Sequence, residues 1–303
     1  MTRTLTCLLL ALAASLAAAD NPRLVGYLPY WATARVEPGI YPGLTDLILF
    51  SGEPRADGSL DATRLERMPW DKVAAVRASG VRVHLCLGGW GRSRHFAVVT
   101  GEARLRARFV AETAAFCSRH GLDGVDLDWE HPKGAAQLAA YGLLVDELKA
   151  ALAARKGEVT LTLAGAAQLP PNGGRRADRV QLMAYDLPGR HAATEASVAR
   201  AEALLSAGVP PERLVLGVPF YGRGVKDRNR TLPYREILAR HHPKPDQDDA
   251  DGLHFNGPAT MARKAAWVRQ RGLAGVMAWE LTQDATGEAS LLRILRSELD
   301  RGR

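Results

Sequence analysis

Three carboxylates at alternate positions of one short segment are the clearest sign of chemistry in the sequence. The run from Asp123 to Glu130 reads DGVDLDWE. Because successive side chains of a strand point to opposite faces, a strand here would place Asp126, Asp128 and Glu130 together on one face. Crowded and buried carboxylates repel one another, so some of them must hold protons. The outermost could then stay protonated near neutral pH and act as a general acid.

The alternative interpretations of this segment are a solvent-facing acidic strand end and a metal cage. Neither a histidine nor a further acid of suitable spacing accompanies the three carboxylates. Burying three carboxylates also costs so much free energy that we expect the cluster to have a function. The sequence holds no glycine-rich phosphate loop and no zinc-ligand spacing. These observations favour acid–base chemistry, and we expect neither a metal requirement nor a cofactor.

The elements that must position these residues alternate along the chain. Short apolar runs predict strands over residues 24–28, 46–50, 82–87, 124–129, 159–164, 179–185, 214–220 and 275–279. Amphipathic stretches predict helices over residues 64–79, 102–120, 135–154, 194–207, 258–271 and 288–299. This alternation predicts an α/β fold, a single-domain (β/α)8 barrel over residues 20–303, with a doubly wound open sheet as the alternative. In a barrel, the acidic run would lie at the carboxyl ends of the strands, where such enzymes keep their active sites.

One segment, residues 224–256, departs from this pattern between the seventh strand and the next helix. It is rich in proline, histidine and aspartate, and we interpret it as a short inserted loop that lines the rim. A metal site is the alternative, because it holds His241, His242, Asp246, Asp248, Asp249 and Asp251. The spacing of a calcium loop fails, since Gly257 stands at the twelfth position where a bidentate glutamate belongs.

The first 19 residues have the pattern of a secretory signal peptide. A basic start precedes an apolar run from Leu5 to Ala18, and small residues end at Ala19. We therefore expect a secreted or periplasmic protein without a membrane span in its mature form. The formal net charge is +7, and the basic residues are scattered rather than gathered in a stripe. This distribution argues against nucleic acid as a partner.

At this point the sequence resembles glycoside hydrolase family 18, the chitinase family, whose signature D-G-x-D-x-D-W-E is matched in full by Asp123 to Glu130. Further motifs resemble the family at the ends of the expected strands. They are Val25-Gly-Tyr27 followed by Trp31, Leu87-Gly-Gly-Trp90, Met183-Ala-Tyr185-Asp186, Val218-Pro-Phe-Tyr221-Gly-Arg223 and Gly275-Val-Met-Ala-Trp279-Glu280. The resemblance covers the whole chain after the signal segment.

The resemblance implies hydrolysis of β-1,4 links after an N-acetylglucosamine unit by substrate-assisted retention, an exception to the two-carboxylate scheme. Glu130 would protonate the leaving oxygen while the acetamido carbonyl of the sugar attacks the anomeric carbon. Asp128 would orient the acetamido N–H and stabilise the positive charge, and Tyr185 would hydrogen-bond the attacking carbonyl. Asp126 would tune Asp128 through a shared proton.

Aromatic and polar residues of the same motifs would bind the sugar, because its C–H face packs on flat apolar surfaces while its hydroxyls need polar partners. We expect Trp279 to form the floor of the site and Trp129 to point outward into the core. The other expected substrate-binding residues are Tyr27, Gly89, Trp90, Met183, Asp186, Tyr221 and Arg223, with Trp31 a weaker candidate.

Two departures from the family pattern have consequences. Cys86 stands where the family usually has a serine that bonds the inner aspartate, so we expect Asp126 to be less well held. Cys86 would lie at the top of the barrel and Cys117 near the bottom, too far apart for a disulfide. The shortness of segment 224–256 predicts a shallow groove suited to endo-acting cleavage.

Other functions share these residues. An endo-β-N-acetylglucosaminidase of N-glycans or a hydrolase of cell-wall glycan would use the same carboxylates. A non-catalytic chitin-binding lectin would keep the barrel, but such relatives typically lack the acid that Glu130 supplies here.

Overall fold

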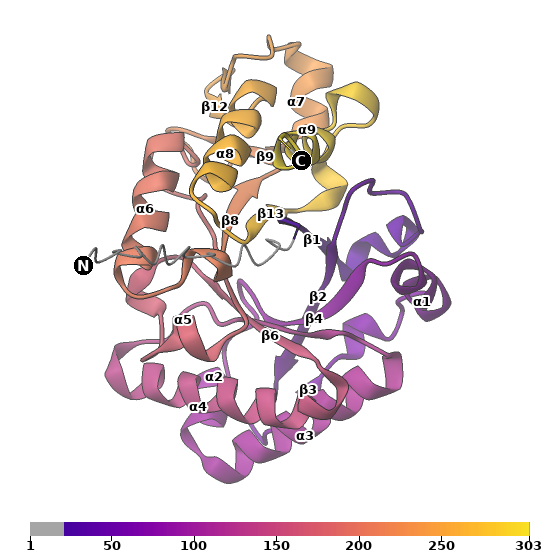
Figure 1. Ribbon diagram of the computed structural model, residues 1–303, viewed down its shortest axis with the longest axis vertical. Coiled ribbons are helices and arrows are strands. Elements are labelled where there is room, and N and C mark those ends of the chain that lie inside the picture. The colour runs from indigo at the N-terminus through magenta and orange to yellow at the C-terminus, as the bar shows by residue number, and fades with distance from the viewer. Residues whose placement is uncertain (1–20, 303) are drawn as a thin grey trace, which may run out of the picture.

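The computed structural model describes residues 21–302, in which eight parallel strands close into a barrel (Figure 1). They are β1 (Arg23–Pro29), β2 (Asp46–Pro54), β4 (Arg82–Gly88), β5 (Gly124–Asp128), β6 (Glu158–Leu163), β7 (Arg179–Leu182), β8 (Leu214–Pro219) and β13 (Gly275–Trp279). Their order is β1-β13-β8-β7-β6-β5-β4-β2, and β1 pairs with β2 to close the ring. The predicted (β/α)8 barrel is confirmed. The expected signal segment lies outside the described residues.

Helices surround the barrel, as Figure 1 shows. They are α1 (Trp70–Ala78), α2 (Phe96–Gly101), α3 (Ala103–His120), α4 (Gly134–Leu152), α5 (Gly173–Arg176), α6 (Thr194–Ser206), α8 (Pro258–Gln270) and α9 (Leu291–Leu299). Two start three or more residues later than predicted. Pro69 precedes α1 directly and disfavours helical geometry at Met68. Ser290 caps α9 by accepting a hydrogen bond from the Arg293 N–H. None of the helices within residues 21–302 is long and apolar enough to cross a membrane.

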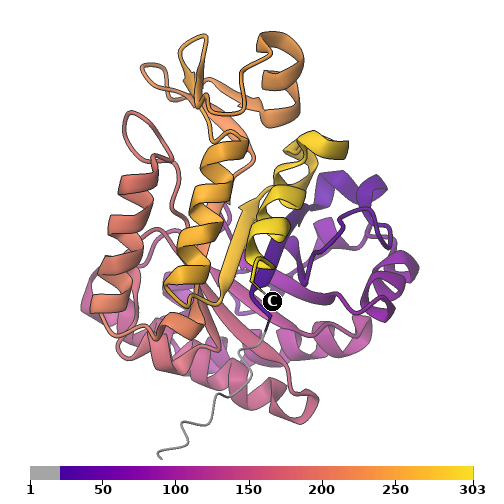
Figure 2. The same cartoon turned by 45° about the horizontal axis from the view of Figure 1, so that its top comes forward.

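The inserted segment is a small α+β unit, and our expectation of a loop was wrong in this respect. The segment contains β10 (Thr231–Pro233), α7 (Tyr234–His241), β11 (Asp249–Ala250) and β12 (Leu253–His254), and β9 (Tyr221–Gly224) leads into it; residues 221–256 together are called the inserted unit below. These strands form an antiparallel sheet in the order β10-β9-β12-β11. The unit stands beyond the barrel at the top of Figure 2. The inserted unit is ordered by strand pairing with β9 and by burial of Ile237 and Phe255, which its polar composition does not indicate.

Three aspartates of this unit have protein partners. Asp249 pairs with Arg190 and Asp251 with Arg230. Asp248 accepts hydrogen bonds from the Gly257 N–H and the Thr260 hydroxyl at the start of α8. Pairing and capping therefore account for these aspartates without a bound ion.

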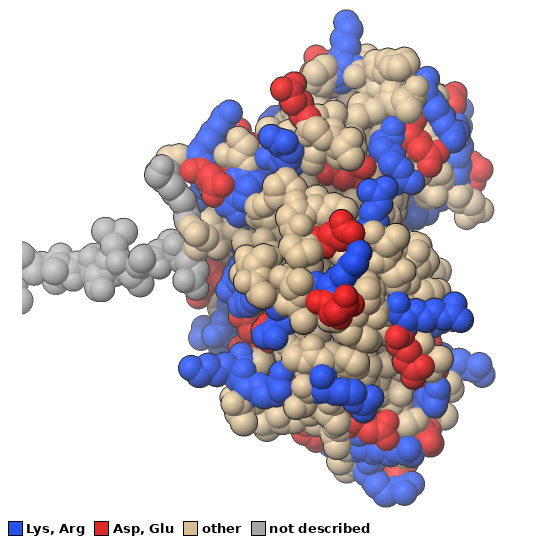
Figure 3. Space-filling view, turned by 90° about the vertical axis from the view of Figure 1, so that its right-hand side faces the viewer, with Lys and Arg blue, Asp and Glu red and all other residues tan. Residues whose placement is uncertain are grey.

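The main apolar core lies between the barrel and its helices. Trp129 belongs to it, with 3% of its surface exposed, and stacks on Phe96 at 5.4 Å between ring centroids. This confirms the outward orientation predicted for Trp129. Cys86 on β4 and Cys117 on α3 are buried and unbonded. On the face shown in Figure 3, basic and acidic side chains are interspersed, as expected from the sequence.

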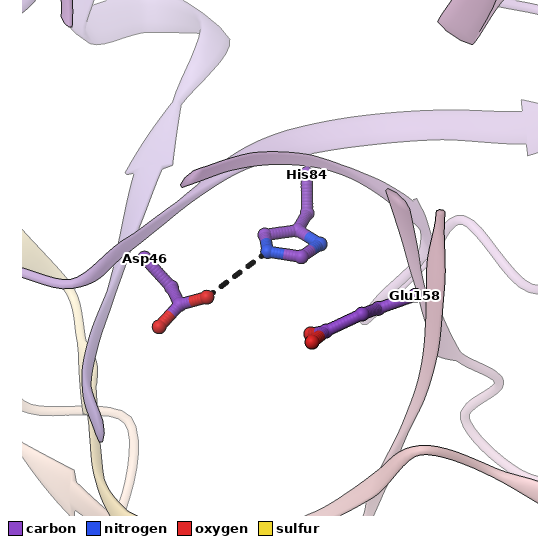
Figure 4. Close-up of side chains that lie close together, drawn as sticks. All are labelled: Asp46, His84 and Glu158. Carbon is purple, nitrogen blue, oxygen red and sulfur yellow. Dashed lines mark hydrogen bonds and ion pairs between the residues drawn. The ribbon is translucent and has the colours of Figure 1, made fainter. Parts of the chain in front are cut away.

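Charged side chains close the amino-terminal end of the barrel. Asp46, His84 and Glu158 point toward one another there (Figure 4), with candidate ligand atoms within 4.8 Å of each other. Asp46 contacts Arg82 at 2.6 Å and His84 at 3.1 Å, and Glu158 pairs with Arg82 and Arg179. Because the arginines already supply positive charge, we interpret this basal charge cluster as a set of ion pairs that closes the end of the barrel, and not as a metal centre. Its members are Arg23, Asp46, Arg82, His84, Glu158 and Arg179.

Replacing Asp46 with asparagine should destabilise the barrel by about 2 kcal/mol, because the buried His84 and the half-buried Arg82 lose a buried counter-charge while Glu158 still pairs with Arg82. Denaturant unfolding of the wild type and the variant measures the difference. The control is Asp300→Asn, which removes an exposed pair with Arg296 and should cost less than about 1 kcal/mol. An equal loss in the free energy of unfolding for the two substitutions would contradict a stabilising role of the basal charge cluster.

Candidate active site

A cavity of about 660 Å³ opens at the carboxyl ends of the barrel strands. Most of the predicted site residues line it. The lining residues are Tyr27, Phe50, Trp90, Asp128, Glu130, His131, Thr162, Ala164, Met183, Tyr185, Asp186, Tyr221, Arg223, Arg228, Asn229, Thr231, Trp279 and Gln283. Asp126 and Gly89, also predicted, lie outside this lining. The fold thus gathers residues from most of the strand ends and from the inserted unit around one space.

Glu130 follows β5 and stands on the wall of this cavity. Its side chain is 13% exposed, and its N–H donates to the Ser93 hydroxyl at 2.9 Å. Burial raises the pKa of Glu130 to about 7, and the negative charge of Asp186 adds to the effect. A carboxyl group with this pKa holds its proton through the acid range up to neutrality and can exchange it there.

Asp128 lies deeper, at the end of β5, with 4% of its surface exposed. Burial raises the pKa of Asp128 well above its usual range, and the charges of Glu130 and Asp126 raise it further. Its Oδ1 atom is buried and has no hydrogen-bond partner among residues 21–302. An unpaired buried acceptor beside a cavity is costly on its own, and it is suited to a donor that a ligand supplies.

Asp126 lies below the cavity and is completely buried. Its Oδ2 atom accepts a hydrogen bond from the Tyr27 hydroxyl at 2.6 Å. Its Oδ1 atom accepts hydrogen bonds from Thr160 at 2.5 Å, Thr162 at 2.8 Å and Gln181 at 2.9 Å. These donors come from β1, β6 and β7 and hold the carboxylate firmly.

We expected Cys86, in place of the family's serine, to leave Asp126 less well held. The thiol lies beside Asp126 on the neighbouring strand, in register with it. However, hydroxyl and amide donors from other strands already satisfy both carboxylate oxygens of Asp126. The hydrogen bonds of Asp126 within the described residues go to these donors, and the charge of Asp126 helps to raise the pKa of Asp128. The proton that we expected the two aspartates to share stays a prediction.

Tyr185 and Asp186 lie just beyond β7, which ends at Leu182 rather than at 185 as predicted. Asp186 accepts a hydrogen bond from the Tyr221 hydroxyl at 2.6 Å, and its carboxylate forms an ion pair with Arg223 at 2.7 Å. Burial alone would raise the pKa of Asp186, but His191, Tyr221 and Arg223 together lower it. Asp186 is thus a negatively charged residue of the cavity wall, and its charge helps to raise the pKa of Glu130.

Aromatic rings complete the cavity. Trp279 ends β13 and packs against Phe50 at 4.8 Å and Tyr27 at 5.4 Å between ring centroids. Trp90 lines the rim with 80% of its surface exposed. Trp31 is 58% exposed and packs edge-on against Phe50, outside the lining of the cavity. The site therefore offers a buried aromatic floor and an exposed aromatic edge.

Two predicted substrate-binding residues have other surroundings. The Tyr27 ring borders the cavity, but its hydroxyl is committed to Asp126 and Thr162. Gly89 has a φ of +100°, and its N–H donates to the Asp128 carbonyl at 2.7 Å. A Cβ at Gly89 would stand 2.3 Å from the Phe50 ring, so this glycine serves close packing beneath the site.

Sequence reasoning missed several lining residues. Thr162 and Ala164 lie at the end of β6, and Phe50 ends the strand predicted over residues 46–50, although β2 continues to Pro54; their places at predicted strand ends were a usable signal. Arg228, Asn229 and Thr231 belong to the β9–β10 connection and strand β10 of the inserted unit. We expected this segment to line the rim, but its composition did not indicate which of its residues would reach the cavity. His131 and Gln283 complete the missed set.

Comparison with known proteins agrees with this geometry. The profile described as "Glycosyl hydrolases family 18" matches residues 23–284. Chitinase 1 of Aphanocladium album is 26% identical over 270 aligned residues, covering 70% of this chain and 64% of the relative. Chitotriosidase-1 of Mus musculus is 25% identical, covering 92% of this chain and 78% of the relative. The chain thus spans slightly less than two thirds of the first of these relatives.

A solved structure gives the same picture. The chitinase ChiB from the chitin utilization locus of Flavobacterium johnsoniae superposes with a TM-score of 0.80 at 27% identity, covering 92% of this chain and 94% of that chain. Because the family profile spans most of the chain, including every barrel strand and the acidic run, we conclude that the protein belongs to glycosyl hydrolases family 18.

Proposed function

We propose that this protein hydrolyses β-1,4 links after N-acetylglucosamine units in chitin or chito-oligosaccharides. The observation that carries the proposal is the state of Glu130, a cavity-wall carboxyl with a pKa raised to about 7, beside the buried Asp128 and the Tyr185 ring. A general acid needs a pKa near the working pH. The chitinase names of the relatives favour chitin-type substrates over N-glycans or cell-wall glycan.

In the proposed reaction, Glu130 donates its proton to the glycosidic oxygen as the bond from that oxygen to the anomeric carbon breaks. The acetamido carbonyl oxygen of the sugar forms the new bond to the anomeric carbon, giving an oxazolinium ion. Asp128 accepts a hydrogen bond from the acetamido N–H at its unpaired Oδ1, and the Tyr185 hydroxyl donates to the carbonyl oxygen. These contacts fix the attacking geometry before the barrier is reached.

The second half of the reaction returns the proton. Glu130, now a carboxylate, accepts a proton from a water molecule whose oxygen bonds to the anomeric carbon and opens the oxazolinium. Two inversions at this carbon give net retention of configuration. The negative charge of Glu130 in the intermediate also offsets the positive charge of the oxazolinium, which is worth most in a site shielded from water.

We also infer that the protein is exported, which rests on the pattern of residues 1–19 alone. In addition, we expect endo-acting cleavage, because the inserted unit is small and leaves room for a chain to enter sideways. Long oligomers should then yield products of mixed length from the start. Steady release of dimers from one chain end would contradict endo-acting cleavage.

Replacing Glu130 with glutamine should lower kcat on N-acetylglucosamine hexamer by about 10² to 10⁴, because the amide cannot donate the proton. Products resolved by mass and anomer at early times should be shorter β-anomeric oligomers for the wild type. The matched control is Glu202→Gln on α6, which should leave kcat unchanged because Glu202 is exposed and pairs with Arg271.

The outcomes separate the candidate functions. Initial α-anomers from the wild type would contradict retention, and equal activity of Glu130→Gln would contradict its role as the acid. An intact hexamer that binds tightly to the wild type would favour a lectin. An intact hexamer that does not bind would favour N-glycan or cell-wall substrates.

Replacing Asp186 with asparagine should move the alkaline limb of kcat/KM toward lower pH. The charge of Asp186 helps to keep the pKa of Glu130 near 7, so its removal lets Glu130 lose its proton at lower pH. A pH profile on the hexamer measures the limb, and Asp249→Asn on the exposed rim is the control. An unmoved limb in Asp186→Asn would contradict the coupling between the two carboxyl groups.

A further inference from the structure

Lys264 is a buried cation that the proposed reaction does not use. It lies in the middle of α8, and 1% of its surface is exposed. Its ammonium donates to the Ala192 carbonyl at 2.9 Å, the Ser197 hydroxyl at 3.0 Å and the Asn256 side-chain oxygen at 2.8 Å. An ammonium buried without a contacting carboxylate is costly, so a full set of hydrogen bonds is what makes this position tolerable. Burial lowers the pKa of Lys264 to about 7, which reflects the same cost.

The partners of Lys264 come from segments that are separate in the sequence. Ala192 belongs to the connection after β7, Ser197 to α6, and Asn256 to the stretch between the inserted unit and α8. The Asn256 amide also donates to the Ala192 carbonyl, at 3.0 Å. Helices α6 and α8 lie side by side in Figures 1 and 2, with Lys264 bonded across them. The Lys264 ammonium thus connects these three segments behind the wall of the active site. We call Lys264 and its three hydrogen-bond partners the Lys264 junction.

Two paths lead from this junction to the cavity. The first runs through Ser197, whose hydroxyl bonds the Ala184 carbonyl at 3.1 Å, directly before Tyr185. The second runs through Ala192, which packs in the same inner apolar cluster as Tyr185. Next to it, His191 is completely buried, with its Nδ1 atom 3.5 Å from Asp186.

Tyr185 needs such support because regular structure ends before it. Strand β7 stops at Leu182, so ladder hydrogen bonds do not hold the backbone at 185. Within residues 21–302, the Tyr185 hydroxyl donates a long hydrogen bond, 3.9 Å, to the Met277 sulfur. The aim of the hydroxyl therefore depends on the backbone position and on packing.

We propose that Lys264 is a positioning residue for Tyr185 and Asp186, which ties residues 184–192 to α6 and α8 through its hydrogen bonds. The consequence for catalysis rests on the proposed function, in which Tyr185 holds the acetamido carbonyl in the transition state. A displacement of about 1 Å at such a group can cost about 10²-fold in rate. Substrate binding across the aromatic floor does not depend on this junction.

The test compares Lys264→Met, which keeps the stem and removes the donors, with the wild type. Hydrogen–deuterium exchange should rise about tenfold or more in peptides covering residues 183–193 and stay unchanged in β4. On N-acetylglucosamine hexamer, kcat should fall about 10- to 100-fold while KM stays within about threefold, measured well below the Tm of the variant. The control is Lys149→Met, a helix lysine of α4 bonded to Asp178 at 2.7 Å, which should change neither readout.

Ser197→Ala keeps Lys264 and removes the link to Ala184, so it should change both readouts in the same direction by a smaller amount. It carries the test if Lys264→Met fails to fold. Unchanged exchange in residues 183–193 would overturn the proposal whatever the activity. Raised exchange with unchanged kcat would overturn the effect on catalysis. A wild type that cleaves no N-acetylglucosamine oligomer would instead sink the proposed function, while the exchange comparison still decides whether Lys264 holds this segment.

Discussion

The burial of the Asp126 carboxylate is the constraint on which the rest of the site depends. A carboxylate inside a barrel is stable only where donors surround it, because burial without hydrogen bonds costs several kcal/mol. Here the donors come from β1, β6 and β7, so these strands must hold one register relative to β5. Once that register is fixed, the pleat of β5 directs Asp128 toward the cavity, and Glu130 follows at its wall.

The three carboxyl groups differ in how many hydrogen bonds they accept, and this difference gives them different chemical properties. Asp126 is saturated by donors, Asp128 keeps an unpaired oxygen, and Glu130 borders the cavity. Desolvation and mutual repulsion therefore fall on Asp128 and Glu130, whose pKa values rise. At the other end of the barrel, the basal charge cluster compensates its carboxylates with arginines. The barrel thus keeps carboxylates that are paired with arginines at the bottom and carboxyl groups with raised pKa values at the mouth.

The parts of this arrangement that depend on periodicity could be predicted from the sequence. Alternation along β5 predicted the shared face of its carboxylates, and the motifs of the family resemblance, which fall at predicted strand ends, implied Trp279, Met183 and Tyr221 at the cavity. Register between distant strands could not be predicted, so Thr160, Thr162 and Gln181 were not expected to hold Asp126. The inserted unit was mistaken for a loop because its strands are very short and pair with β9, which carries a site motif itself.

Different interactions hold the Asp128 side and the Tyr185 side of the site in place. Asp128 ends a barrel strand and pairs with Gly88 of β4, directly after Leu127, which pairs with strands on both sides, so the barrel fixes its position. Tyr185 and Asp186 follow a strand that has already ended, so tertiary contacts must fix them from behind. Tyr221 and Arg223 hold Asp186 from the inserted unit, and the Lys264 junction holds the backbone. Variation in the inserted unit or in α8 should therefore change the Tyr185 side of the site while leaving the carboxylates of β5 where they are.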